Sequence, residues 1–169
     1  MPGRRIAKIT ASYLEHVTTW YLERHATSTA HLRSLLLQRV RRSAEAHGTD
    51  PAEGQALVEA ELERLERLGL LNDARYAEDK ARSLRRRGAS TRKVRATLQE
   101  KGVAEAPASE EADPDWLAAR VWARRRRIGP WRTGPVDAEV RKKELAKLAR
   151  AGFSFDVARR VVDSEDQED

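Results

Sequence analysis

The chain has 169 residues and a formal net charge of +6, and it contains no cysteine, which excludes disulfides and thiolate metal sites. No apolar run approaches the roughly 20 residues needed to span a bilayer. The basic start of the sequence lacks the apolar stretch of a secretory signal. We therefore expect a cytoplasmic protein that forms one domain or several small helical units in a row.

Apolar residues recur at helical spacing along the whole chain, and no stretch alternates as a strand does. The first stripe contains Ile9, Tyr13, Val17 and Tyr21, and similar stripes follow over 32–40 and 58–68. Capping side chains accept hydrogen bonds from free amides, and proline suits a first turn. Helix starts are therefore predicted at Ser28, Asp50-Pro51, Asn72, Ser90 or Thr91, Asp113-Pro114, Gly134-Pro135 and Ser154. Residues 104–113 are rich in alanine and acids and predict a short helix or a linker. The sequence thus predicts an all-α protein.

The helices form an internal repeat. A shift of 62 residues places Ser28, Leu32 and Leu36 on Ser90, Val94 and Leu98, and a further shift of 50 places Leu98 and Gly102 on Leu148 and Gly152. We interpret this as three copies of a three-helix unit, with an eroded, weak last helix in the second copy, stacked into an elongated, curved molecule. The predicted parts are a basic extension (1–8), three repeats (9–71, 72–112 and 113–162) and a disordered acidic tail (163–169).

Several segments share their order and spacing with a known family. Residues 69–77 read Gly-Leu-Leu-Asn-Asp-Ala-Arg-Tyr-Ala; Lys101-Gly102-Val103 and Gly152-Phe153-Ser154 follow at the family's positions. The chain resembles the RecX family of recombination regulators over almost its whole length and departs from it at 104–113. The resemblance implies tandem three-helix repeats and binding to RecA filaments, whose growth, ATPase activity and strand exchange are restrained. It also implies contact with DNA and no catalytic residue.

Basic residues gather near predicted helix ends, where the helix dipole favours them. Arginine has a planar fork that pairs with carboxylate or phosphate, so these clusters are also candidates for contact with a filament or with single- or double-stranded DNA. We expect Trp131, in a loop rich in glycine and proline, to be the most exposed tryptophan and a possible partner contact. The candidates are Arg39, Arg41, Arg42, Arg85, Arg86, Arg87, Arg92, Lys93, Arg95, Arg124, Arg125, Arg126, Arg127, Trp131 and Arg132.

The sequence gives little support to an enzyme. It contains no glycine-rich phosphate loop, and its histidines show no metal-ligand spacing with acids. We therefore expect no catalytic residue, metal or cofactor, no membrane contact, and a monomer.

Two groups of acids have structural interpretations. Asp73 is expected to cap its own helix, and the acids at 110, 111, 113 and 115 to form a solvated linker. Residues 163–169 contain five acids and no base, so the rest of the chain carries +11; this tail either aids solubility or masks basic residues.

One alternative function remains open from the sequence. Short helices rich in arginine are also compatible with a direct DNA-binding regulator of helix-turn-helix type. Against it, no single helix has the mixture of asparagine, glutamine and arginine typical of a base-reading surface.

Overall fold

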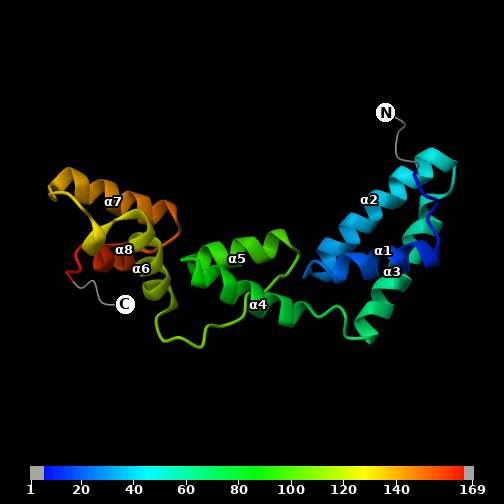
Figure 1. Cartoon of the computed structure of the whole chain (residues 1–169), viewed down its shortest axis with the longest axis horizontal. Coiled ribbons are helices and arrows are strands. Elements are labelled where there is room, and N and C mark those ends of the chain that lie inside the picture. The colour runs from blue at the N-terminus through cyan, green and yellow to red at the C-terminus, as the bar shows by residue number, and fades with distance from the viewer. Residues whose placement is uncertain (1–5, 166–169) are drawn as a thin grey trace. The chain divides into compact units, whose positions relative to one another are not determined.

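The computed structural model describes residues 6–165, and within that range it contains eight α-helices, one 3-10 turn and no strand (Figure 1). The predicted all-α class is confirmed. The elements are α1 (Ala11–Leu22), α2 (Thr29–His47), α3 (Pro51–Arg67), α4 (Asp73–Arg86), α5 (Thr91–Glu100), α6 (Pro114–Arg126), η1 (Gly129–Trp131), α7 (Ala138–Arg150) and α8 (Phe155–Val162). The outer parts of the predicted extension and tail, 1–5 and 166–169, lie outside the described residues.

The chain divides into two compact units. Unit 1 comprises residues 1–76 and 101–103, and its core lies where α3 packs against α1 and α2, around Leu14, Leu36 and Leu62. Unit 2 comprises residues 77–100 and 104–169, and its core lies where α8 packs against α6 and α7, around Ala119 and Leu148. The repeat limits given above stay predictions.

Most of the predicted helix starts are confirmed, since the side chains of Ser28, Asp50 and Ser154 accept hydrogen bonds from the first turns of α2, α3 and α8. The predicted start at Gly134-Pro135 is wrong. Helix α7 begins at Ala138, because the Asp137 carboxylate accepts a hydrogen bond from the Val140 amide at 2.7 Å and takes over the capping role.

The segment 104–113 forms no helix, so of the two alternatives that the sequence left open, a short helix or a linker, the linker is observed. The interpretation of the acids at 110, 111, 113 and 115 as a solvated linker is wrong for two of them. Asp113 caps α6 through the Trp116 amide at 3.2 Å and pairs with Arg160 at 2.7 Å. The Asp115 carboxylate accepts a hydrogen bond from the Thr91 amide of α5 at 2.6 Å.

The first amides of α2 and α5 are satisfied by the same arrangement, which we call the serine joint. In unit 1, Ser28 caps α2 and donates to the carbonyl of Lys101, while the Asp73 carboxylate accepts from the Thr29 amide at 2.7 Å. Asp73 therefore caps α2, and the expectation that it caps its own helix is wrong; Asn72 caps α4 instead.

The second serine joint lies in unit 2. There Ser90 accepts from the Lys93 amide at 3.3 Å and donates to the carbonyl of Ala151 at 3.0 Å, while Asp115 holds the Thr91 amide. The two serines are related by the 62-residue shift of the repeat, so the internal repeat is preserved in polar contacts as well as in apolar spacing.

Candidate arginine-lined binding site

Two arginine clusters that are far apart in the sequence meet in unit 2. Arg125, in α6, donates through Nη1 to the main-chain carbonyl of Arg87 at 3.1 Å, just after the end of α4. Gly88 allows this approach: a Cβ there would lie 2.8 Å from the Trp122 amide nitrogen and 3.0 Å from the Ala118 carbonyl oxygen. The clusters 85–87 and 124–127 therefore belong to one surface.

A cavity of about 700 Å³ lies between α4, α6 and the segment 107–111, and we call it the arginine cavity. Its charged lining consists of five arginines and three glutamates, and much of the remaining lining is apolar. The charged residues are Arg82, Arg85, Arg86, Arg120, Arg124, Glu78, Glu110 and Glu111; the apolar ones include Ala81, Leu117, Ala118, Val121 and Trp131. This volume and mixed lining are typical of a ligand-binding site.

Arginine side chains stack on the tryptophans around this cavity. The guanidinium of Arg120 lies 5.5 Å from the ring of Trp116 and 5.3 Å from the ring of Trp131, and the guanidinium of Arg160 lies 4.4 Å from the same Trp116 ring. The hydrogen bond from Arg160, opposed by burial, holds the pKa of the Asp113 carboxyl below its usual value. Arg120 and Trp131 are both lining residues, so their stacked pair forms part of the cavity wall.

The prediction that Trp131 is the most exposed tryptophan is wrong. Its ring is half-buried against the core of unit 2, whereas Trp20 is 51% exposed and carries Arg24 stacked at 4.5 Å. The glycine and proline residues around Trp131 form the η1 turn, which returns the ring to the core. Trp131 remains a lining residue of the arginine cavity.

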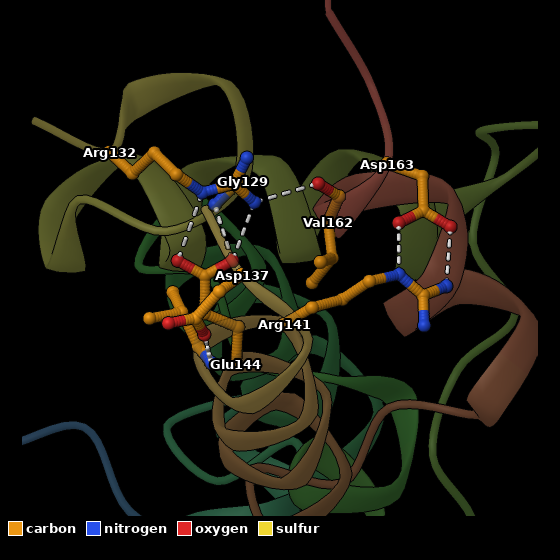
Figure 2. Close-up of polar contacts among 8 residues, drawn as sticks. Gly129, Arg132, Asp137, Arg141, Glu144, Val162 and Asp163 are labelled. Carbon is orange, nitrogen blue, oxygen red and sulfur yellow. Dashed lines mark hydrogen bonds and ion pairs between the residues drawn. The ribbon is translucent and has the colours of Figure 1, made fainter. Parts of the chain in front are cut away.

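Arg132 is engaged inside unit 2 (Figure 2). Its Nη2 lies 2.6 Å from a carboxylate oxygen of the buried Glu144 and 2.9 Å from the carbonyl oxygen of Val162. The same carboxylate accepts from the Gly129 amide at 3.3 Å. Sequence reasoning did not identify Glu144 as a structural residue; the signal was that it breaks the repeat, standing where Val94 stands in the second copy.

The other candidates are not among the residues that line the arginine cavity. In α5, Lys93 and Arg95 are exposed, and Arg92 donates to the Ala149 carbonyl at 3.2 Å. In α2 of unit 1, Arg39 donates to the Tyr13 hydroxyl at 3.3 Å. Its neighbours Arg41 and Arg42 are exposed.

Residues 6–165 contain no group of three or more His, Cys, Asp and Glu side chains placed to hold a metal ion. No helix in that range is long and apolar enough to cross a membrane.

The serine joints, the repeated helices and the converged arginines define a protein of tandem helical repeats with a charged surface. The family model described as "RecX, second three-helix domain" matches residues 72–110. The Regulatory protein RecX of Myxococcus xanthus is 47% identical over 168 residues, covering 95% of this chain and 90% of the relative. That of Agrobacterium fabrum is 33% identical over 153 residues, covering 89% and 82%.

The chain therefore belongs to the RecX family, and the resemblance found in the sequence is confirmed. A regulatory role follows from this membership. No solved structure matches the chain.

Proposed function

We propose that this protein binds filaments of RecA recombinase and restrains their growth, ATP hydrolysis and strand exchange, without catalysing a reaction itself. Membership of the RecX family supports the regulatory part of this proposal. The observation that carries the binding part is the convergence of clusters 85–87 and 124–127 on one surface. Guanidinium groups pair with both carboxylate and phosphate, the two anions that a nucleoprotein filament presents.

The proposed mechanism is a shift of an assembly equilibrium. A ligand changes an equilibrium only by its difference in affinity for the two states. A protein that contacts the assembled filament differently from the separate subunit therefore changes filament growth or the ATPase cycle without chemistry of its own. The arginine surface is the proposed contact, with Arg39, Arg41, Arg42, Lys93 and Arg95 as further candidates.

The test is a titration of the protein into RecA filaments on single-stranded DNA, following ATP hydrolysis and filament length. Reversal of Arg85, Arg86 and Arg87 to Glu should raise the concentration needed for half-maximal effect by at least about tenfold, because each lost charge pair removes roughly 0.5–1 kcal/mol or more. The matched control reverses Lys142, Lys143 and Lys147, three exposed bases of α7, to Glu. Equal losses in the two variants would contradict the proposed surface.

A parallel titration into naked DNA separates this function from its rival. A direct DNA-binding regulator would bind naked duplex tightly and leave RecA ATPase unchanged. Purified protein alone should neither hydrolyse ATP nor cut DNA; an activity abolished by substitution of one acid or histidine of this chain would contradict the non-enzymatic proposal.

A further inference from the structure

The main chain leaves α8 beside the turn that helps to line the arginine cavity (Figure 2). Arg132 holds the Val162 carbonyl, and Arg141 pairs with the Asp163 carboxylate at 2.7 Å. Gly129, the first residue of η1, lies against the backbone of Val161. The turn η1 ends at Trp131, which lines the cavity. The chain is therefore anchored at Asp163, next to the turn that supplies one lining residue of the cavity, Trp131.

The sequence beyond this anchor is complementary in charge to the cavity. Residues 164–169 read Ser-Glu-Asp-Gln-Glu-Asp, with four acids and no base. The cavity has five arginines against three glutamates, so its lining carries an excess of positive charge. Six residues extend over about 20 Å at 3.3–3.6 Å each. They follow α8, which packs against η1, and the last residue of η1, Trp131, lines the cavity.

One arginine of the cavity has a nitrogen without a hydrogen-bond acceptor. Within the described range, Arg85 Nε is a buried nitrogen with no partner. Leaving such a donor unsatisfied costs free energy that an incoming acceptor restores. A carboxylate is the natural acceptor, because its two oxygens match two N–H groups of a guanidinium. Arg85 is a lining residue, so the cavity combines an excess of positive charge with an arginine whose Nε has no acceptor among the described residues.

We propose that the arginine cavity is a binding site for a carboxylate-rich peptide, and that residues 164–169 of the same chain occupy it when no partner is bound. The segment pairs with Arg82, Arg85 and Arg86 and covers arginines that a polyanion would otherwise contact. A partner must displace it, so binding to isolated DNA is weakened. This last consequence rests on the proposed function, whereas occupancy of the cavity does not.

Cysteine cross-linking in the full-length chain tests occupancy directly, because the sequence contains no natural cysteine. One variant combines Gln167→Cys with Leu117→Cys, since Gln167 is uncharged and Leu117 is an exposed lining residue. The matched variant combines Gln167→Cys with Phe155→Cys, an exposed position at the other end of α8. Under mild oxidation the first disulfide should form about tenfold faster than the second, because docking raises the local concentration of the thiol.

The ratio of the two rates should fall towards one in about 1 M salt, where the Debye length is near 3 Å. It should fall likewise when Arg85 and Arg86 are changed to Ala, and when Glu165, Asp166, Glu168 and Asp169 are changed to their amides, a change that leaves the cavity intact. Equal rates for the two cysteine pairs in low salt would overturn the proposal. This measurement involves no RecA. Equal cross-linking rates would therefore contradict occupancy of the cavity without affecting the proposed function, and a protein that does not regulate RecA could still show the faster cross-link.

Discussion

The two units place the same polar joint at the start of a central helix, yet they surround it differently. In both, a serine caps the helix and bonds a distant carbonyl, and an aspartate from another helix holds the next amide. In unit 2 the joint gains a bond from Arg92 to the Ala149 carbonyl. The repeat therefore keeps its helix-end chemistry even though the segment 104–113, which follows α5, forms no helix.

Among the described residues, each unit also buries one glutamate, and the partners differ. In unit 1, Glu61 accepts from the Thr18 hydroxyl at 2.6 Å and pairs with Arg64, one turn along the same helix, at 2.8 Å. In unit 2, Glu144 is held by Arg132, which arrives from a loop. The Glu61–Arg64 pair lies within one helix and forms when that helix forms. The Glu144–Arg132 pair instead joins α7 to the loop that contains Arg132.

The largest effect is expected from Arg132→Met, which removes one partner of the pair in unit 2. It leaves the buried Glu144 without a counter-charge and should lower the free energy of unfolding by about 3 kcal/mol. Arg64→Met should cost less, because that guanidinium is more exposed and helix α3 retains its core contacts. Urea unfolding followed by circular dichroism measures both, and hydrogen exchange assigns the loss to a unit. An equal loss in the two variants would contradict the distinction.

Substitution of Gly152, which lies against Ser90 of the second serine joint, should have the next largest effect on stability. Gly152 has φ +101°, and a Cβ there would clash with the Ser90 hydroxyl. Gly152→Ala should cost about 2 kcal/mol, from left-handed strain plus the displaced serine. Gly69→Ala is the matched control, since Gly69 has φ +69° and a Cβ added there would meet no atom within 4 Å; it should show the strain alone, about 1 kcal/mol. Thermal unfolding gives the difference; identical losses would mean that the close approach is unimportant.

Removal of the aspartates that cap a neighbouring helix should have a similar effect at the two joints. Asp73→Ala and Asp115→Ala should each lower the free energy of unfolding by about 1 kcal/mol, the usual cost of a lost cap. The variants Asp73→Asn and Asp115→Asn should retain most of this stability, since the amide oxygen of asparagine still accepts the hydrogen bond. Urea unfolding of the four variants measures these free energies. If the Asn variants lose as much stability as the Ala variants, the charge of the carboxylate matters more than its hydrogen bond.

The smallest effect is expected from protonation of the Glu61 carboxylate at low pH. Burial opposes its ionisation, but hydrogen bonds from Arg64 and Thr18 outweigh burial and lower the pKa of its carboxyl below the usual 4.5. The ionised group therefore stabilises unit 1 above about pH 4.5, and this contribution is lost as pH falls through the lowered pKa. Glu61→Gln should flatten the decline in stability between about pH 5 and the acid limit, as measured by urea midpoints. A decline as steep as in the unchanged protein would contradict this role.

Much of the fold was predictable from local signals. Apolar spacing located the helices, and the caps Ser28, Asp50 and Ser154 act within a few residues of their own position. The arginine clusters were also visible as candidates. Three of the failures, at Asp73, Asp115 and Trp131, share one cause: each side chain contacts an element outside its own helix or turn.

The sequence by itself determined the helical class, the repeat, the family and the charge of the candidate surfaces, because these depend on residue type and spacing. Only the tertiary structure decided which arginines share a cavity and which bond to the protein itself. Arg85 and Arg124 line one cavity because Gly88 admits the α6 backbone, whereas Arg132 is engaged by Glu144. Such pairings join residues far apart in the chain, where no periodic pattern specifies which charges will meet.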